Sequence, residues 1–143
     1  MKPYLSVVIP AYNEEVNLKK GMLDKVEAFL SSVDYPFEVL IVDDGSQDQT
    51  GLLVANFIKK RPNWHLNSTS HGGKALAVMT GLLAASGEVA LFADMDQATP
   101  IREVEKFIPK FRQGFDIVIG SRRGREGAPF LRKLAAWGFA LIR

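Results

Sequence analysis

The chain contains the run Glu38-Val39-Leu40-Ile41-Val42-Asp43-Asp44-Gly45-Ser46, in which four consecutive apolar residues lead into two carboxylates and a glycine. A strand with one face in water alternates apolar and polar residues, whereas a strand that is buried on both faces is continuously apolar. The same continuity occurs at Ile117-Val118-Ile119. Because helices cover both faces of parallel sheets, these runs predict strands of a mainly parallel sheet.

Short apolar runs alternate with longer segments of helical period along the rest of the chain. The alternation predicts an α/β fold with a mainly parallel, Rossmann-like sheet flanked by helices, in a single domain over residues 1–143. The expected strands cover residues 5–9, 38–42, 65–67, 89–93 and 116–119. The expected helices cover residues 14–32, 48–60, 73–86, 101–112 and 129–143.

The composition fits one globular domain, because 47% of the 143 residues are hydrophobic and 24% are charged. The sequence has no cysteine, so a metal has to be held by oxygen or imidazole ligands. The apolar run at residues 5–9 meets Pro10 and acidic residues without a cleavage pattern, which indicates a buried strand rather than a signal peptide. No run approaches the roughly 20 apolar residues that span a bilayer, so we expect a soluble or peripheral protein.

The net charge of +2 is unevenly distributed. Residues 1–101 carry 8 basic and 12 acidic groups, whereas residues 102–143 carry 10 basic and 4 acidic groups. An acidic first part suits a metal site and a basic end suits an anionic partner, although scattered solvated charge explains the same division.

Two acidic residues, Asp94 and Asp96, follow the strand expected at residues 89–93, where open parallel sheets bind their ligands. In an extended segment their side chains point to the same side. Adjacent carboxylates repel, and oxygen ligands favour Mg²⁺ or Mn²⁺, which also bind substrate phosphates. Such an ion would stabilise a departing diphosphate. The alternative interpretation is a solvated acidic turn.

The turn after residues 38–42 has both a structural and a binding interpretation. Gly45 is expected to adopt a positive φ, and Asp48 is expected to cap the next helix. Asp43 can accept a hydrogen bond from a pyrimidine or purine N–H, and Tyr12 can stack on the base. Alternatively, Tyr12 packs as an aromatic residue at the edge of the sheet.

A third segment, His71-Gly72-Gly73-Lys74, begins the helix expected at residues 73–86. Glycine permits close approach of the backbone, and a helix N-terminus favours an anion. The spacing of a full phosphate loop is incomplete, because Ala75 stands where Ser or Thr is required. His71 is interpreted either as an exposed loop residue or as a ligand.

Taken together and in order, four segments resemble family 2 glycosyltransferases of GT-A fold: Pro10-Ala11-Tyr12-Asn13-Glu14-Glu15, Val42-Asp43-Asp44-Gly45-Ser46-Gln47-Asp48-Gln49-Thr50, Asp94-Met95-Asp96 and Ile119-Gly120-Ser121-Arg122. The similarity spans almost the whole chain and is strongest to the dolichyl-phosphate and polyprenyl-phosphate sugar synthases. It implies transfer of a sugar from a nucleoside diphosphate sugar, of UDP-glucose or GDP-mannose type, to a polyprenyl phosphate. It also implies assistance by Mn²⁺ or Mg²⁺.

The resemblance implies roles for individual residues, which fall into a donor group, a metal pair and an acceptor pair. The donor group holds the nucleoside diphosphate sugar and comprises Pro10, Tyr12, Glu14, Asp43 and Lys74. The metal pair is Asp94 and Asp96, which also serve the ribose. The acceptor pair is Arg122 and Arg132, which meet the acceptor phosphate. Asp96 and Arg122 are the residues expected to take part in catalysis, and Arg122 and Arg132 also border the donor.

Two positions depart from the family pattern. The usual Asn-x-Gly-Lys-Gly segment is replaced by His71-Gly72-Gly73-Lys74-Ala75. In the mannose branch a Leu-Gln pair commonly follows the acidic pair and its Gln helps to hold the metal, whereas here Gln97-Ala98 follows. The metal-holding glutamine is therefore shifted by one position or absent.

The expected reaction is an inverting transfer, in which an oxygen of the polyprenyl phosphate attacks the anomeric carbon. A phosphate monoester is already anionic near neutral pH, so a dedicated general base is dispensable. Two alternatives stay open, namely a donor-binding fragment without turnover and a family 2 glycosyltransferase with another acceptor. Nucleotidyltransferases and receiver domains fit less well, because no glycine-rich loop and no acidic pair directly follow the first apolar run.

The end of the chain is basic and apolar at once. Residues 120–143 hold six basic residues against the single acid Glu126, beside the helix expected at residues 129–143. Such a helix lies at a lipid interface or packs on the sheet as core. The resemblance favours the cytoplasmic face of a membrane, and it implies that the chain is incomplete on its acceptor side. No nucleic-acid partner is expected, and no oligomeric state is predicted.

Overall fold

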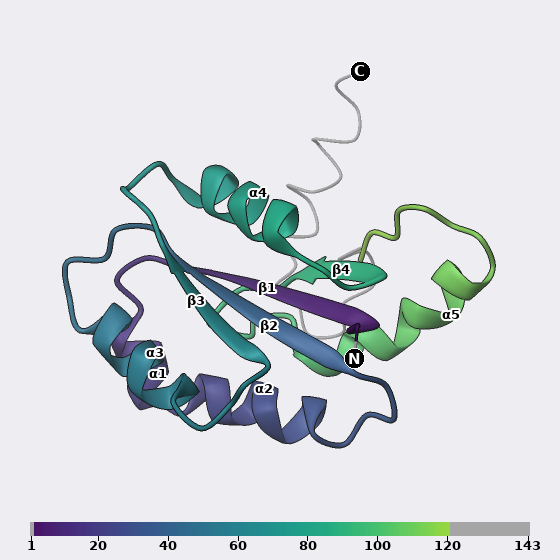
Figure 1. Ribbon diagram of the computed structural model, residues 1–143, viewed down its shortest axis with the longest axis horizontal. Helices are drawn as coiled ribbons and strands as arrows, with labels where there is room; N and C mark the ends of the chain where they lie inside the picture. The colour runs from purple at the N-terminus through teal and green to yellow at the C-terminus, as the bar shows by residue number, and fades with distance from the viewer. Residues whose placement is uncertain (1, 121–143) are drawn as a thin grey trace, which may run out of the picture.

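The computed structural model describes residues 2–120. Within them one sheet has four parallel strands in the order β3-β2-β1-β4 (Figure 1). The strands are β1 (Leu5–Ala11), β2 (Phe37–Asp43), β3 (Trp64–Ser68) and β4 (Val89–Phe92). The helices are α1 (Glu15–Lys19), α2 (Met22–Leu30), α3 (Thr50–Ile58), α4 (Lys74–Ala84), the 3-10 helix η1 (Ile101–Lys106) and α5 (Ile108–Arg112). The predicted α/β class with a parallel sheet flanked by helices is confirmed.

Helices cover both faces of the sheet, with α4 on one side and α1, α2 and α3 on the other (Figure 1). β1 places Val7 and Ile9 in the larger core cluster, together with buried residues of α2, α3 and η1. Val8 faces the opposite way and packs with Ala77 of α4. A Cβ on Gly81 would lie 2.3 Å from Cγ1 of Val8, so this glycine lets α4 approach the sheet closely. Burial on both faces explains the continuously apolar strands.

The strand register brings three loops to one edge of the sheet. Ala11, the last residue of β1, pairs with Asp43, the last residue of β2. Asp43 in turn pairs with Ser68, the last residue of β3. Because the strands are parallel, the segments that follow them open on the same side.

Two predicted helices differ from those observed. The helix expected at residues 14–32 breaks at Gly21, which has a φ of +71° and separates α1 from α2. Glycine adopts this conformation without the steric cost that other residues incur. The helix expected at residues 101–112 is split into η1 and α5, and Pro109 lies in the first turn of α5. Proline has no N–H to donate to the preceding turn, so it favours a new helix start over continuation.

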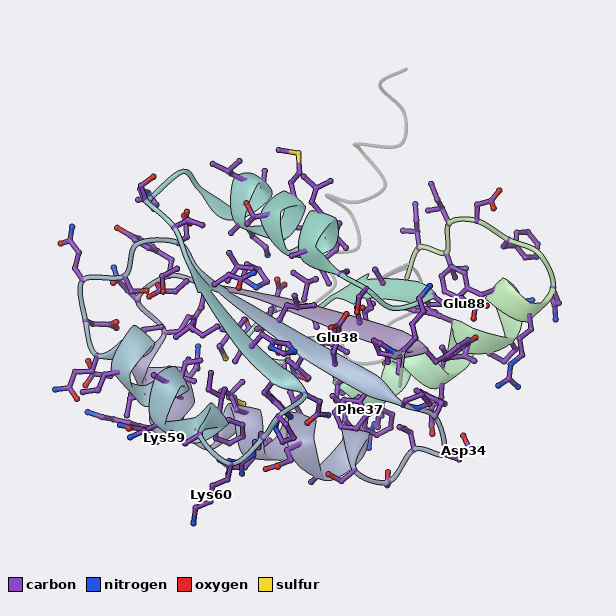
Figure 2. All side chains as sticks on the ribbon, viewed as in Figure 1. Asp34, Phe37, Glu38, Lys59, Lys60 and Glu88 are labelled. Carbon is purple, nitrogen blue, oxygen red and sulfur yellow. The ribbon has the colours of Figure 1, made fainter. Side chains whose placement is uncertain are left out.

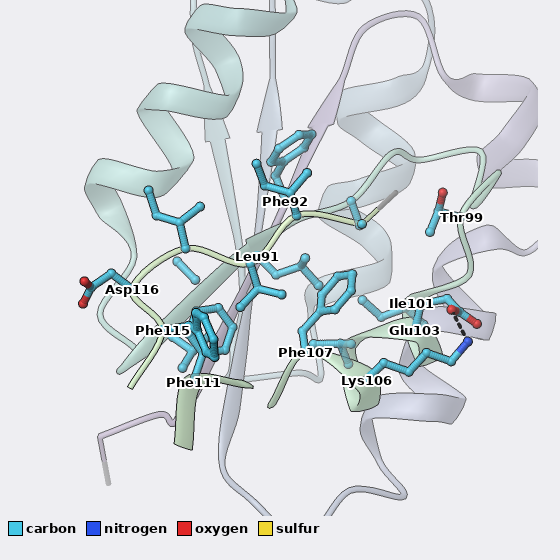
Figure 3. A pocket seen from close by; sticks show the side chains of 18 of the residues that line it. Leu91, Phe92, Thr99, Ile101, Glu103, Lys106, Phe107, Phe111, Phe115 and Asp116 are labelled. Carbon is cyan, nitrogen blue, oxygen red and sulfur yellow. Dashed lines mark hydrogen bonds and ion pairs between the residues drawn. The ribbon is translucent and has the colours of Figure 1, made fainter. Parts of the chain in front are cut away.

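The strand expected at residues 116–119 is not formed. Residues 114–120 and β4 together line a cavity of about 1590 Å³ (Figure 3). Residues 116–119 form no backbone ladder with β4, and Ile117 and Ile119 are 78% and 84% exposed. The prediction of a buried strand here is therefore wrong. An apolar composition favours a strand, but a strand also needs a neighbouring strand to pair with.

The helix expected at residues 129–143 lies outside the described residues. Across residues 2–120, none of the helices combines the length and the apolar character that a membrane span requires.

A polar cluster around the buried Ser6 and Glu38 ties the starts of β1 and β2 to the segment between α4 and β4. The Ser6 hydroxyl donates to Oε1 of Glu38 at 2.5 Å, and the Ser86 N–H and hydroxyl donate to the same oxygen at 2.7 and 3.0 Å. Gly87 N–H donates to Oγ of Ser6 at 2.8 Å. Glu38 lies among the strands, whereas Glu88 lies near the start of β4 (Figure 2). Burial raises the pKa of Glu38, but the hydrogen bonds from Ser6 and Ser86 outweigh burial and hold that pKa below 4.5.

We expect Glu38→Gln to lower the free energy of unfolding at pH 7 by about 1–3 kcal/mol, because the charged acceptor of three hydrogen bonds is lost. The lowered pKa of Glu38 stabilises the fold above the unfolded-state pKa, and this stabilisation disappears as the pH falls below about 4.5. The difference between wild type and variant should therefore shrink in acid. Urea unfolding from pH 7 downward measures it, with the exposed Glu88→Gln as the control. A difference that stays constant with pH would contradict this assignment.

Candidate functional site

A cavity of about 280 Å³ opens at the carboxyl ends of the strands. Its walls come from the segments that follow β1, β2, β3 and β4. The cavity is lined by Pro10, Ala11, Tyr12, Glu14, Asp44, His71, Lys74, Ala77, Asp94, Met95 and Asp96. It thus brings together the predicted donor group, except for Asp43, and both residues of the predicted metal pair.

Reciprocal hydrogen bonds join the loop after β1 to the loop after β2. Asn13, which has a φ of +54°, donates its N–H to Oγ of Ser46 at 3.0 Å and accepts from Gln47 N–H at 2.9 Å. Glu14 N–H donates to Oγ1 of Thr50 at 2.7 Å. Asp48 accepts from Glu15 N–H at 3.2 Å and from Thr50 N–H at 2.9 Å. The N-cap of α3 is Gln49 and not the expected Asp48. Asp48 lies one residue earlier, where it accepts from the first N–H of α3 and also joins the two loops.

Asp43 and Asp44 point to different places. Asp43 is buried, and its Oδ1 accepts a hydrogen bond from Ser46 N–H at 3.0 Å within its own turn. Asp44, and not Asp43, lines the cavity. The contact of Asp43 with a nucleoside stays a prediction, whereas the importance of Asp44 was missed because adjacent carboxylates in a turn look alike in sequence.

Asp44 anchors the loop between β3 and α4. Its carboxylate accepts hydrogen bonds from the N–H groups of Gly72 and Gly73, each at 2.8 Å, and lies 2.9 Å from Nδ1 of His71. The hydrogen bond from Gly72 contributes most to lowering the pKa of Asp44; burial opposes it, and Gly73 and His71 lower the pKa further. These two N–H groups, which were expected to favour an anion, hold the protein's own carboxylate.

The predicted positive φ of Gly45 is confirmed at +71°. A Cβ at this position would lie 2.8 Å from the backbone nitrogen of His71. The glycine therefore serves both its own turn and the close approach of the next loop.

Tyr12 and His71 form a stacked pair at the cavity. Their ring centroids are 4.2 Å apart with an interplanar angle of 24°. Tyr12 is 42% exposed, so it is not simply packed into the edge of the sheet. The structure thus gives His71 a defined partner on each side, a carboxylate and an aromatic ring.

The acidic pair lies opposite the first residue of α4. Lys74 forms an ion pair with Oδ1 of Asp94 at 2.5 Å, and both side chains are partly exposed. Oδ1 of Asp96 accepts from Ala98 N–H at 2.9 Å. These contacts engage one carboxylate oxygen of each aspartate.

Gln97 braces this loop from a φ of +53°. Its Nε2 donates to the carbonyl oxygen of Asp94 at 2.9 Å, and its Oε1 accepts from Ile101 N–H at 3.0 Å. The oxygen that could serve a metal is thus engaged, and Gln97 holds the loop together instead.

The carboxylate oxygens in the cavity fit a hard divalent cation that is bound partly by the protein and partly by substrate phosphates. The part of the chain that the structure describes has no cluster of three or more His, Asp or Glu side chains suited to a metal. Asp94 and Asp96 supply carboxylate oxygens, and Mg²⁺ typically binds one or two carboxylates together with substrate phosphates. The predicted acceptor pair, Arg122 and Arg132, lies outside the described residues.

A parallel sheet with polar loops gathered at its carboxyl edge is the arrangement of α/β nucleotide-binding domains. The family model described as "Glycosyl transferase family 2" matches residues 6–141, and the chain belongs to that family. The resemblance deduced from the four sequence segments is confirmed.

Individual relatives agree with this assignment. The chain is 35% identical to a dolichyl-phosphate beta-glucosyltransferase of Dictyostelium discoideum, covering 97% of this chain and 48% of that protein. It is 34% identical to a dolichol-phosphate mannosyltransferase of Pyrococcus furiosus, covering 96% and 40% respectively. The chain thus spans less than half the length of these relatives.

Among solved structures, the chain resembles the mannosyltransferase PcManGT from Pyrobaculum calidifontis in complex with GDP-Man and Mn²⁺. The TM-score is 0.56 with 31% sequence identity, covering 73% of this chain and 31% of the other. The expected GT-A fold is confirmed by this likeness.

We expect Gly45→Ala to destabilise the chain more than Gly21→Ala, by at least about 1 kcal/mol. Both glycines have a φ of +71°, so both variants incur similar backbone strain. At Gly21 the nearest obstacle is the flexible side chain of Asp24, whereas at Gly45 it is the backbone of His71. Chemical unfolding of the two variants decides the point, and equal losses would contradict a tight packing of the two loops.

Proposed function

We propose that this chain is the donor-binding part of an enzyme that transfers a sugar from a nucleoside diphosphate sugar to a polyprenyl phosphate. The observation that carries the proposal is the meeting of the Tyr12 ring, Lys74 and the acidic pair Asp94 and Asp96 in one cavity at the carboxyl edge of the sheet. The names of the relatives, which include dolichyl-phosphate and undecaprenyl-phosphate sugar transferases, support the lipid phosphate as the acceptor class.

Different residues of the site bind different parts of the nucleoside diphosphate sugar. Tyr12 stacks on the base, and Pro10 and Glu14 border the nucleoside in the cavity. Asp43, which does not line the cavity, is the further contact that the family resemblance implies for the nucleoside. Lys74 brings positive charge to the diphosphate, for which it exchanges its contact with Asp94. The donor is a uridine or guanosine diphosphate sugar, and the D. discoideum relative favours a glucosyl donor.

Asp94 and Asp96 would hold a Mn²⁺ or Mg²⁺ ion, which supplies Lewis-acid stabilisation of the diphosphate leaving group. The Mn²⁺ in the PcManGT complex supports a divalent cation in this cavity. Asp96 is the principal ligand in this proposal, because Asp94 is paired with the cationic Lys74, whereas Asp96 accepts a hydrogen bond from the uncharged N–H of Ala98.

The transfer itself inverts the anomeric centre. An oxygen of the polyprenyl phosphate forms the new bond to the anomeric carbon, while the bond from that carbon to the diphosphate breaks and the nucleoside diphosphate leaves. Because the attacking phosphate is already anionic, no proton has to be removed by a general base. Arg122 and Arg132 hold the acceptor phosphate, and Arg122 is the one of the two that takes part in catalysis.

The lipid acceptor places the reaction at a membrane, and the proposal assigns it to the cytoplasmic face. The excess of basic residues in residues 102–143 supports contact with anionic headgroups or with the acceptor phosphate. A second candidate is donor binding without turnover, because the residues gathered in the cavity are those assigned to the donor and the metal.

We expect the chain to bind UDP-glucose or GDP-mannose only with Mn²⁺ or Mg²⁺ present, because Asp94 and Asp96 otherwise repel the diphosphate. Asp96→Asn should weaken binding more than Asp94→Asn. Calorimetry with and without EDTA measures both effects, and the exposed Asp116→Asn is the charge-matched control. Equal affinity in EDTA would remove the metal from the proposal, and the opposite order of the two variants would exchange their roles.

In a full-length enzyme that contains this chain, Arg122→Lys and Arg132→Lys should raise the apparent KM for polyprenyl phosphate and leave the donor affinity nearly unchanged. Arginine binds phosphate through a planar pair of donors that lysine lacks. Transfer kinetics at varied acceptor concentration test this, with the exposed Arg102→Lys as the control. If donor affinity falls while acceptor dependence stays flat, these arginines belong to the nucleotide site.

A further inference from the structure

The imidazole of His71 is held by the carboxylate of Asp44, which is almost inaccessible to solvent. The Asp44 side chain is 3% exposed, whereas the His71 side chain is 54% exposed. Nδ1 of His71 lies 2.9 Å from Oδ2 of Asp44 and 3.2 Å from the Asp44 carbonyl oxygen. Both neighbours accept hydrogen bonds only, so the assignment of the proton to Nδ1 follows from them.

The backbone of His71 is confined as well. Gly45 approaches its nitrogen so closely that a Cβ would be 2.8 Å away, and Asp44 binds the N–H groups of the two following glycines. An imidazole fixed at one ring nitrogen and at its backbone has little freedom to turn. Its ring therefore presents a constant surface to Tyr12.

That surface covers part of the Tyr12 ring. At a centroid separation of 4.2 Å the two rings are already in contact, so no base fits between them. Tyr12 keeps 42% of its surface exposed, and this remainder is what the cavity offers for stacking.

We propose that His71 is a positioning residue for the donor nucleoside, which orients Tyr12 by stacking on it and is itself oriented by Asp44. The inference rests on the proposed function and deepens it. It also explains what a histidine does at the position where the related segment has asparagine, since the amide can bond Asp44 but has no ring to place against Tyr12. Lys74, in the same cavity, serves the diphosphate rather than the base.

The proposal separates base recognition from phosphate recognition. Calorimetry in Mn²⁺ would compare UDP, GDP and inorganic pyrophosphate on the wild-type chain and on His71→Asn. We expect His71→Asn to weaken the tighter of the two nucleotides about three- to tenfold and to leave pyrophosphate unchanged. The exposed His65→Asn on β3 is the matched control and should change neither.

A double-mutant cycle shows whether His71 acts through Tyr12. Tyr12→Ala alone should weaken the nucleotide about five- to thirtyfold, and adding His71→Asn should cause no further loss. In addition, the ring-proton NMR signals of His71 should move in Tyr12→Ala, while those of His65 stay in place. Thermal unfolding of each variant confirms that it is folded.

Three results would overturn the inference while sparing the proposed function: unchanged nucleotide affinity in His71→Asn, an equal loss for pyrophosphate, or a full further loss in the Tyr12→Ala background. The last would mean that His71 touches the ligand directly. Failure of the wild-type chain to bind either nucleotide would overturn the proposed function, and the inference would fall with it.

Discussion

The carboxylate of Asp44 is the constraint on which the arrangement of the site depends. It is almost fully buried, and a buried charge is tolerable only when hydrogen bonds replace its water. Gly72, Gly73 and His71 provide these bonds. The loop between β3 and α4 therefore stabilises the ionised carboxylate, and the carboxylate in turn fixes the conformation of the loop. Since Asp44 directly follows β2, the loop is fixed to the sheet itself. The first residue of α4, Lys74, takes its position from the same anchor.

The remaining loops are fastened by short polar side chains rather than by apolar packing. Asn13 donates its N–H to Ser46 and accepts from Gln47 N–H between the loops after β1 and β2, and Thr50 accepts from the N–H of Glu14. A loop at the open edge of a sheet carries backbone groups that the strands no longer satisfy, and side chains of this length reach them. Much of the motif that marks the family is therefore structural, and the proposed ligand contacts come from Tyr12, Lys74 and the acidic pair.

The sequence predicted the sheet better than it predicted the site. Apolar runs located β1 and β2, because a strand that is buried on both faces consists mostly of apolar residues. Residues 116–119 have the same composition but form no strand, since composition does not specify a pairing partner. Position relative to the strand ends correctly gathered Tyr12, Lys74 and Asp94 in one cavity. The sequence could not predict which of Asp43 and Asp44 faces that cavity. The directions of neighbouring side chains in a turn depend on backbone angles, which the residue types do not determine. The stacking of His71 on Tyr12 joins loops nearly sixty positions apart, and only the fold reveals it.

The ion pair between Lys74 and Asp94 is the contact that the proposed diphosphate would have to replace. The lysine also reduces the repulsion between Asp94 and Asp96. The pair is partly exposed, and such pairs contribute only about 0–1 kcal/mol, so separating them costs little. In the proposed function Asp94 would help to hold a divalent cation, and Lys74 would then be released from Asp94 to contact the diphosphate. The binding of metal and of donor would then favour each other. The cation would neutralise Asp94 after Lys74 has left it, and the diphosphate would neutralise the released Lys74.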